Sequence, residues 1–480
     1  MTCKSIKIFT CLTCCVLSFL WVSSCDTKHR DTSQNDTQPS ETHQLPEDTR
    51  NIEAGLVIPD EGYCDQPYVV INEDGSWTCT MTTGSGHEGS GGQHIISICS
   101  TDQGKTWSAP VDIEPSDGPE ASWVMPLKIP GVRIYAFYTY NADNMRDVIA
   151  GTDYARKRVD TLGAYMFKYS DDNGASWSKN RYTIPVRLMD IDRKNPYHGD
   201  VLFFWGVGNP IIHNGSMYLG FNKIGSFGEG FIESSQACFL KSDNILTESD
   251  PEKINWITLP EGESGLVAPK GPIAEESNLV GLNDGSLYCT YRTVDGSPCH
   301  AYSRDGGRTW TATSYMTYTP GGKRVKHPRA ANFVWKASNG KYLYWYHNHG
   351  GKSYDSRNPV WLCGGVERYG YIYWSQPEIL IYDDNIGNRM SYPDFIEQDG
   401  RYFMTETQKT VARVHEIDGA LLEGLWNQQE NTSLTRDGLI LELTGPECRN
   451  GVKVEMPRLP YISRGAQRGG LSFDFRIKFS

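Results

Sequence analysis

Apolar and polar residues alternate along most of the chain in short runs, many of which end at an Asp-Gly or Asn-Gly pair. Five units of run, turn and run begin at residues 67, 210, 278, 332 and 393, and a weaker sixth covers residues 126–131. An alternation of period two is typical of β-strands, and an Asx-Gly pair between two such runs is typical of a hairpin turn. No stretch keeps a helical period for more than three turns. The pattern therefore predicts an all-β fold made of six similar units.

A second repeat, Ser-x-Asp-x-Gly-x-Thr/Ser-Trp, occurs at residues 100–107, 170–177 and 303–310, and residues 367–374 resemble a decayed fourth copy. In each copy we expect the Asp to accept hydrogen bonds from its own turn, the Gly to adopt a positive φ and the Trp to cover the loop. Six units at unequal spacing between residues 67 and 400 fit a six-bladed β-propeller, in which radial packing protects the sheet edges.

Composition agrees with a fold of many short strands and turns. The 480 residues include 48 Gly, 25 Pro, 27 Tyr and 13 Trp, without a collagen-like period. A net charge of −12 and the lack of a basic run argue against nucleic acid as a partner. Aromatic side chains that could stack on sugar rings are abundant, although we expect most of them in the core: Trp123, Trp205, Phe227, Trp335, Tyr344 and Tyr346.

The N-terminal region predicts export. Lys4 and Lys7 precede an apolar stretch at residues 8–22, which is shorter than the ~20 residues of a stable membrane span but typical of a signal peptide. It ends in Val-Ser-Ser-Cys, which resembles a bacterial lipobox, so Cys25 is expected to carry a lipid; a plain signal peptide is the alternative. Residues 26–50 are polar and lack aromatic residues, as in a flexible tether. We therefore expect a protein lipid-anchored in a bacterial cell envelope, at the outer membrane or cell surface, or else a periplasmic or secreted one.

The cysteines do not indicate a metal cluster. Five of the 13 lie in residues 1–25, and the other eight are scattered without a Cys-x-x-Cys spacing. Cys64 with Cys79, and Cys289 with Cys299, could form disulfides or be buried thiols of neighbouring strands. The sequence leaves both alternatives open.

The repeats resemble the Asp boxes of the bacterial neuraminidase repeat, and residues 55–420 are similar to the sialidase superfamily. The resemblance implies a propeller over residues 51–420. It also implies an exo-acting glycoside hydrolase that removes a terminal sugar, sialic acid or a related residue, from a glycan, with retention through a Tyr nucleophile and without a cofactor. Asp boxes lie at the blade periphery in that superfamily, so the function depends on residues at the centre.

The family uses a Tyr nucleophile deprotonated by a Glu, three arginines that bind the substrate carboxylate, and an acidic proton donor. The resemblance makes Tyr392 the nucleophile, because it opens the last blade, with Glu406 one hairpin later. Glu276 is the expected base, and the adjacent Glu275 is the close alternative. A neutral phenol approaches an anomeric carbon that bears a carboxylate at less electrostatic cost than a carboxylate nucleophile does.

Two of the three arginines have counterparts. Arg292 matches the second, and Arg357 matches the third, with Arg329 as a fallback; each could instead be a surface residue at a blade end. The position of the first arginine holds Asp65. Exchanging a guanidinium for a carboxylate changes the local charge by two units, each worth about 3 kcal/mol at ~5 Å and an effective dielectric of ~20. Asp65 therefore predicts weak binding of sialic acid and suits a neutral or cationic sugar.

The expected proton donor is Glu88, in a Gly-rich loop that also contains His87, a candidate for binding substrate. Glu88 can act as a general acid if the site raises its pKa. His87, Glu88 and His94 form an alternative metal-binding set, which we disfavour because such a loop lacks the rigid spacing of a metal motif. The same holds for His347 and His349, whose spacing puts both rings on one strand face.

Residues 421–480 contain a polar spacer and alternating segments at residues 438–443 and 469–477. These segments resemble the opening of a laminin-G or lectin-like β-sandwich that would be incomplete at residue 480; the alternative is one or two strands that pack on the propeller.

Three functions fit the sequence. The first is the sialidase-like glycoside hydrolase. The second is a polysaccharide lyase-type propeller, in which a Tyr and a His remove a proton beside a uronate. The third is a non-catalytic glycan-binding propeller, which the missing first arginine favours. Tyr392, Glu276 and Arg292 together favour the hydrolase.

Overall fold

The computed structural model describes residues 5–8, 48–161, 163–229, 231–430, 441–443 and 475–478. Thr49–Asn431 lie in one compact unit, and the short strands β1 (Ser5–Ile8), β28 (Leu441–Leu443) and β29 (Phe475–Lys478) pair in a three-stranded sheet of a second unit. Cys25, nearly all of the expected leader and tether, and most of the expected lectin-like segment lie outside the described residues. Within the described ranges, no helix is both long enough and apolar enough to cross a bilayer.

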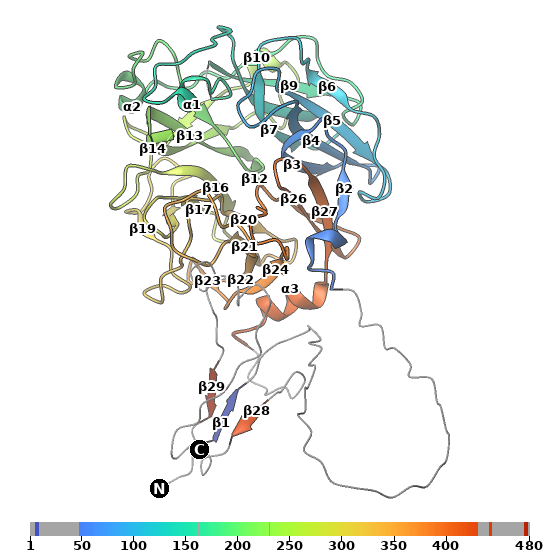
Figure 1. Cartoon of the computed structure of the whole chain (residues 1–480), viewed down its shortest axis with the longest axis vertical. Helices are drawn as coiled ribbons and strands as arrows, with labels where there is room; N and C mark the ends of the chain where they lie inside the picture. The colour runs from blue at the N-terminus through green and yellow to red at the C-terminus, as the bar shows by residue number, and fades with distance from the viewer. Residues whose placement is uncertain are drawn as a thin grey trace, which may run out of the picture. The chain divides into compact units, whose positions relative to one another are not determined.

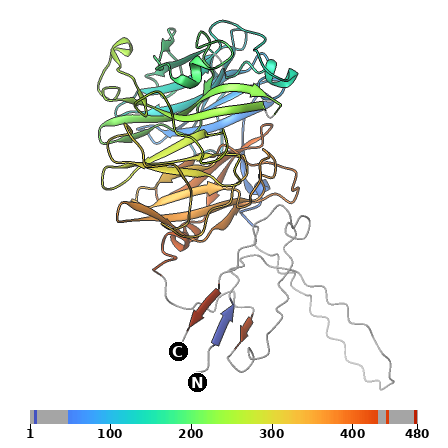
Figure 2. The same ribbon diagram turned by 90° about the vertical axis from the view of Figure 1, so that its left-hand side faces the viewer.

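Six antiparallel sheets follow one another around the larger unit in chain order, from blue to orange in Figures 1 and 2. Blades one and two are β3 (Tyr63–Ile71), β4 (Trp77–Gly84), β5 (His94–Ser100) and β6 (Val111–Glu114), then β7 (Ala121–Lys128), β8 (Ile134–Tyr140), β9 (Ala164–Ser170) and β10 (Tyr182–Thr183). Blades three and four are β11 (Phe204–Trp205), β12 (Ile211–His213), β13 (Ser216–Gly228), β14 (Phe231–Ser242) and β15 (Ile257–Leu259), then β16 (Glu275–Gly281), β17 (Leu287–Arg292), β18 (Cys299–Ser303) and β19 (Ser314–Tyr315). Blade five is β20 (Phe333–Lys336), β21 (Tyr342–Tyr346), β22 (Val360–Arg368), β23 (Tyr371–Trp374) and β24 (Glu378–Ile381). The prediction of an all-β, six-bladed propeller is confirmed.

The last blade closes the ring by taking a strand from the N-terminal end of the propeller. Strands β25 (Phe395–Gln398), β26 (Arg401–Thr407) and β27 (Ala412–Ile417) pair with β2 (Leu56–Ile58), which Figure 1 shows in blue beside the orange β27. A buried side chain joins blades six and one, because Asp394 Oδ2 accepts a hydrogen bond of 2.8 Å from the Val69 amide. This backbone pairing covers the outer edge of β27 with a strand from the other end of the propeller.

The Asp boxes are built as the sequence predicted, each between the third and fourth strands of its blade. In the second box, Asp172 accepts hydrogen bonds from the Ser176 amide (2.8 Å), the Ser176 hydroxyl (2.5 Å) and the Ser170 hydroxyl (2.7 Å). Gly174 has a φ of +85° and packs against Thr78 of the first blade. The decayed copy at residues 367–374 forms the β22–β23 hairpin, which occupies the same place in blade five.

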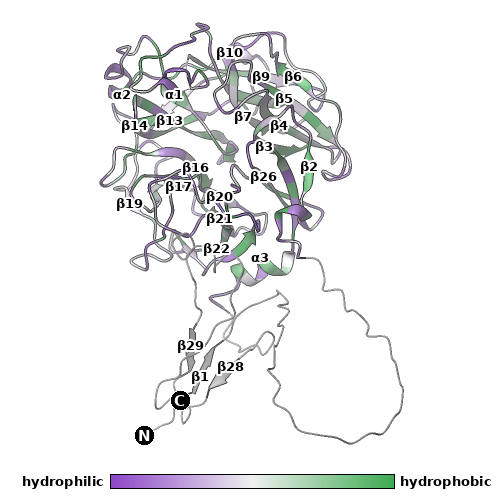
Figure 3. Cartoon of the chain, in the orientation of Figure 1, coloured by the Kyte–Doolittle hydropathy of each residue, from purple (hydrophilic) through white to green (hydrophobic). Residues whose placement is uncertain are grey.

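Buried apolar side chains form the core of the blades, and most connections are hydrophilic (Figure 3). The four cysteines for which the sequence left disulfides open are buried free thiols: Cys64, Cys79, Cys289 and Cys299. Helices are few and short: α1 (Asp153–Arg156), α2 (Asp190–Arg193), α3 (Gly419–Trp426) and the 3-10 turns η1 (Ile52–Ala54) and η2 (Pro251–Lys253). Helix α3 extends the propeller unit beyond residue 420, where we expected a linker to begin, because Leu422, Leu425 and Trp426 are buried and the Trp426 indole donates to the Tyr342 carbonyl.

Candidate active site

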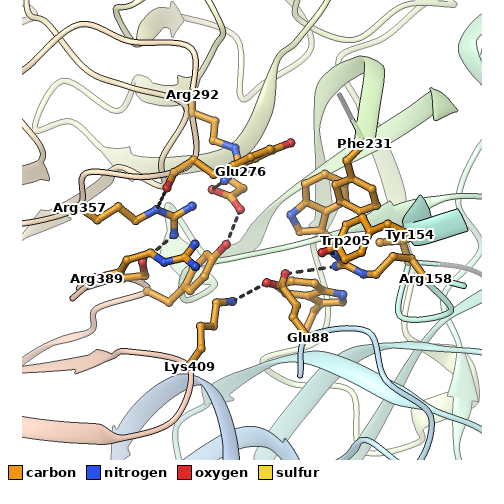
Figure 4. Close-up of a pocket in the computed structure, with 15 residues that line it drawn as sticks. Glu88, Tyr154, Arg158, Trp205, Phe231, Glu276, Arg292, Arg357, Arg389 and Lys409 are labelled. Carbon is orange, nitrogen blue, oxygen red and sulfur yellow. Dashed lines mark hydrogen bonds and ion pairs between the residues drawn. The ribbon is translucent and has the colours of Figure 1, made fainter. Parts of the chain in front are cut away.

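All six blades contribute side chains to one open cavity of about 160 Å³. It contains five basic and two acidic side chains, together with a tyrosine and several other aromatic residues (Figure 4). The lining residues are Glu88, Trp123, Tyr154, Arg158, Thr161, Trp205, Phe231, Glu276, Arg292, Tyr354, Arg357, Arg389, Ser391, Tyr392 and Lys409. A concave site in which ionisable groups from distant segments converge is the usual candidate for an active or ligand-binding site.

Three cavity residues have a left-handed backbone that few side chains adopt. Trp123, Glu276 and Tyr392 have φ values of +62°, +53° and +48°. Trp123 and Glu276 lie at β-bulges in the first strand of their blades, where the register with the second strand shifts. Such a conformation costs about 1–3 kcal/mol in a residue other than glycine and is typical of functional sites. The bulges are the local feature that departs from the alternating strand pattern.

Tyr392 and Glu276 form the central pair. The Tyr392 hydroxyl donates a hydrogen bond of 2.9 Å to Glu276 Oε1, and the two side chains face each other in Figure 4. Both residues are almost fully buried. Burial, reinforced by the negative charge of Glu276, raises the pKa of Tyr392 well above its usual value. Burial also raises the pKa of Glu276 despite the opposing charges of Arg292 and Arg357. The phenol therefore holds the proton, and Glu276 is placed to receive it.

Glu275 has a different environment from its neighbour. Its carboxylate lies between Arg292 Nε and Arg329 Nη2, each 2.7 Å away. Burial by itself raises the pKa of Glu275, but the two guanidinium groups outweigh burial and hold it below its usual value. Arg292 also contacts Glu276 Oε2 at 2.7 Å. Glu275 and Arg329 thus lie behind the cavity and orient Arg292, so Glu276 alone of the two glutamates contacts Tyr392.

Arg357 is a buried cation that contacts no carboxylate directly among the described residues, although its charge acts on Glu276 and Glu88 from a distance. Its Nε donates to the Tyr354 carbonyl at 2.8 Å and its Nη1 to the Ser391 hydroxyl at 2.6 Å, and it makes no ion pair with any described residue. Arg389 lies nearby in the cavity (Figure 4), half exposed and 3.8 Å from Asp355. A buried guanidinium without a counter-ion favours binding of an anion. Of the two residues considered for the third arginine, the structure places Arg357 in the cavity and Arg329 outside its lining.

Asp65, which we expected at the position of the first arginine in the substrate pocket, lies outside the cavity lining. The residue is 1% exposed. Its Oδ2 contacts the ammonium of Lys409 and accepts a hydrogen bond of 2.9 Å from the Tyr63 hydroxyl. Lys409, from the β26–β27 turn, enters the cavity and opposes the charge of Asp65, while burial raises the pKa of the Asp65 carboxyl to about 6. The sequence could not predict the contact between Asp65 and Lys409, because 344 positions separate the two residues.

Glu88 lies in the cavity, but its environment opposes the raised pKa that we expected of a general acid. Its carboxylate oxygens lie 3.2 Å from Arg158 Nη2 and 3.5 Å from Lys409 Nζ. Burial favours the protonated form, but the charges of Lys409, Arg158 and Arg357 outweigh it and lower the pKa of Glu88 to about 2. Glu88 is therefore a carboxylate near neutral pH when the cavity holds no ligand.

Aromatic side chains form the wall opposite Arg357. Trp123 and Trp205 lie 6.2 Å apart between ring centres. Phe231, at the tip of the β13–β14 hairpin, packs on Tyr154 of α1 and lies 4.4 Å below the guanidinium of Arg158. Trp123 and Trp205 are the two of the six candidate stacking residues that line the cavity; Phe227, Trp335, Tyr344 and Tyr346 do not.

Several other predicted residues lie away from the cavity lining. His87 is exposed and contacts Ser90, and Glu406 is buried beside His415. His94 lies 3.5 Å from both Glu61 and Asp112, so it does not share a site with Glu88. In the described part of the chain, no cluster of three or more His, Cys, Asp or Glu residues could hold a metal ion. Arg158, Arg389 and Lys409 were missed because no motif marks them, although Arg389 lies three residues before Tyr392.

The fold and this cavity define a sialidase-like six-bladed propeller. The family model of the BNR repeat-like domain matches residues 124–404, so the chain belongs to this family. The model of the BNR/Asp-box repeat matches residues 98–109. No curated protein matches the sequence at a significant level.

Several solved structures share the fold at low sequence identity. A protein of unknown function from Dyadobacter fermentans has a TM-score of 0.53 and 15% identity over 76% of this chain and 98% of its own. The NanB sialidase of Streptococcus pneumoniae has a TM-score of 0.52 and 13% identity, covering 76% and 70%. The intramolecular trans-sialidase of Ruminococcus gnavus has a TM-score of 0.52 and 14% identity, covering 78% and 99%. At such identities the likeness concerns the fold alone.

Proposed function

We propose that this protein is a retaining exo-glycosidase that removes a terminal sugar acid, sialic acid or a close relative, from a glycan. The observation that carries the proposal is the hydrogen bond from the Tyr392 hydroxyl to Glu276 beside the unpaired Arg357. It joins a nucleophile, a base and an anion site in one cavity. The sialidases among the structural neighbours support a glycan substrate.

In the proposed reaction, Arg292, Arg357 and Arg389 hold the substrate carboxylate, which directs the anomeric carbon toward Tyr392. Glu276 Oε1 takes the phenolic proton as the Tyr392 oxygen bonds to that carbon, and the bond to the leaving oxygen breaks. Glu88 donates a proton to that leaving oxygen. Water then attacks the anomeric carbon and gives one proton to the ionised Glu88, the glycosidic bond to the Tyr392 oxygen breaks, and Glu276 returns the proton to this oxygen. Two displacements at one carbon give net retention.

The aromatic wall supports a role in orienting the sugar. Trp205 and Phe231 offer apolar surface for ring and methyl carbons on the side away from Arg357 (Figure 4), and Trp123 lines the same cavity. The cavity has one cationic side and one apolar side, which can distinguish the carboxylate end of a sugar acid from its apolar end. This arrangement suits an exo-acting enzyme better than one that binds along a polymer.

The low pKa of Glu88 favours a second candidate, a glycan-binding propeller without turnover on natural glycosides. A carboxylate cannot protonate a sugar leaving group, whereas an aryl leaving group departs without that proton. The lyase alternative has less support, because the cavity lining contains no histidine to pair with Tyr392 among the described residues.

The test compares an aryl sialoside, a sialylated oligosaccharide and a neutral aryl glycoside as substrates, with proton NMR of the first-formed anomer. We expect hydrolysis of both sialosides with initial release of the retained anomer. Cleavage of the aryl sialoside alone would favour the binding candidate, and cleavage of the neutral glycoside alone would contradict an acid substrate. A panel of uronate glycans read at the ultraviolet absorbance of an unsaturated product tests the lyase alternative.

A further inference from the structure

Lys409 connects the anion-binding side of the cavity to Glu88. We propose that Lys409 is a positioning residue through which the binding of a substrate carboxylate lets Glu88 take up the proton that it later donates. This inference rests on the proposed function, in which Glu88 is the acid. It accounts for a carboxylate that is ionised in the empty cavity and yet is needed as an acid during the reaction.

The backbone of Lys409 is fixed, so only its side chain can respond to a ligand. Its carbonyl accepts a hydrogen bond of 3.1 Å from the Cys64 amide, and its own amide donates to the Thr407 hydroxyl at 2.8 Å. Its φ is +73°, a conformation that the turn imposes on a residue with a long side chain. The side chain is 20% exposed and lines the cavity.

The ammonium of Lys409 lies between two carboxylates and the ring of Tyr392, the proposed nucleophile. It contacts Asp65 Oδ2, lies 3.5 Å from Glu88 Oε2 and lies 4.2 Å from the centre of the Tyr392 ring. An ammonium has three N–H donors. Asp65 and Glu88 can take two of them, and among the described residues the ammonium makes no third hydrogen bond, its remaining side lying over the Tyr392 ring. It can therefore bind an anion placed beside Tyr392.

Asp65 holds Lys409 in this position. It is buried, and its contacts with Tyr63 and Lys409 come from a strand and a turn that are themselves paired. The buried carboxylate stays behind the lysine when a ligand enters, because it does not line the cavity. Asp65 thus keeps the amine between Glu88 and Tyr392.

The charges around Glu88 decide the effect of a bound anion. Lys409 and Arg158 contact Glu88 directly, and Arg357 acts from across the cavity. Asp65 lies behind Lys409, and Asp160 is paired with Arg158 at 2.6 Å. A substrate carboxylate held by Arg292, Arg357 and Arg389, as in the proposed reaction, adds one negative charge to the cavity that Lys409 and Glu88 share and draws part of the lysine's field to itself. Both effects favour the protonated form of Glu88.

Binding and protonation are then linked in both directions. Glu88 is 29% exposed, so it can take its proton from solvent when the acid binds. In the first displacement, that proton moves to the glycosidic oxygen as the bond from this oxygen to the anomeric carbon breaks. The Tyr392 oxygen bonds to the anomeric carbon, and the phenolic proton moves to Glu276. The products are a glycosyl-tyrosine, a free alcohol, a neutral Glu276 and an ionised Glu88.

The experiment is calorimetric titration of the protein with N-acetylneuraminic acid and, separately, with its methyl ester, at pH 6 in two buffers of different ionisation enthalpy. The difference between buffers counts protons taken up on binding. We expect uptake with the acid and none with the ester. In Lys409→Met, we expect acid binding about tenfold or more weaker, with most of the uptake lost. Glu88→Gln should abolish the uptake and keep most of the affinity.

Lys336→Met is the matched control, because Lys336 lies at the surface and contacts Asn283. Melting temperatures establish that each variant is folded, and Glu88→Gln keeps the test valid if Lys409→Met does not fold. Acid binding without proton uptake, uptake that Lys409→Met leaves unchanged, or no preference for the acid over its ester would each overturn the proposal. Turnover is measured separately, so an enzyme that hydrolyses sialosides without linked proton uptake would retain the proposed function and refute this inference.

Discussion

The Tyr392 hydroxyl donates a 2.9 Å hydrogen bond to Glu276 Oε1 across 116 positions of sequence. Each residue has a positive φ, and each lies in the first part of its own blade. The pair exists because two blades converge at the same cavity. It is the most direct structural support for nucleophilic chemistry in this protein.

Replacing Tyr392 with Phe removes only the oxygen of this pair. If Tyr392 is the nucleophile, the turnover of an aryl sialoside should fall by about a thousandfold or more, while binding of free sialic acid stays within a few fold. Stopped-assay rates and calorimetry measure the two quantities. Tyr165→Phe is the control, because the Tyr165 hydroxyl is equally buried, has no hydrogen-bond partner in the described part of the chain and lies outside the cavity lining. Equal rates in Tyr392→Phe and the native protein would exclude the assignment.

Replacing Arg357 with Met should separate affinity from stability. The guanidinium is buried without an acidic partner among the described residues. Its loss should lower kcat/KM for an acid substrate by about 10- to 100-fold. Removing an unpaired buried charge should also leave the melting temperature unchanged or raise it by a few degrees. The same change at Arg329, which pairs with Glu275, should lower the melting temperature instead. A large loss of stability in Arg357→Met would contradict the description of this site.

Stability should depend on pH through Asp394. Burial raises the pKa of Asp394 to about 7, from a usual value of 3.8. A raised pKa means that the folded state binds the proton more tightly, so this contribution is complete below pH ~4 and is lost as the pH rises toward 7. Asp394→Asn keeps an oxygen that can accept the bond from the Val69 amide and cannot ionise. The variant should be more stable than the native protein at pH 8, by a few kcal/mol at most, and similar below pH 4.

Denaturant unfolding at pH 4 and pH 8 measures this difference. Asp399→Asn serves as the control, since Asp399 lies in the exposed β25–β26 turn. A difference between Asp394→Asn and the native protein that does not change with pH would contradict a raised pKa for Asp394.

The Asp boxes should matter for stability and not for catalysis. Asp172→Ala removes three hydrogen bonds of its turn and should lower the free energy of unfolding by about 1–3 kcal/mol. The neighbouring Asp171 forms a surface ion pair with Arg133, so Asp171→Ala should lower it by less than about 1 kcal/mol. Denaturant melts compare the two. Neither change should alter kcat/KM, and a strong kinetic effect of Asp172→Ala would mean that this peripheral turn communicates with the cavity.

The blades could be predicted from the sequence because their information is local. Alternation of period two specifies strands, Asx-Gly pairs specify turns, and the Asp-box serine, aspartate and glycine satisfy one another within eight residues. Tyr392, Glu276, Arg292 and Arg357 could be proposed from their resemblance to a family. Their convergence in one cavity needed the closed ring.

The order of residues along the chain was enough to predict an all-β propeller of six blades and a set of residues from which its chemistry could be proposed. The charge of the cavity became known only from the folded arrangement of those residues. In the sequence, Asp65 suggests an acidic site, but in the structure Lys409 from the last blade contacts its carboxylate. The sequence also suggests that Glu88 is a general acid, but in the structure Lys409 and Arg158 hold its carboxylate ionised. Electrostatic energy depends on separation in space and on burial, and neither quantity is present in the order of residues along the chain.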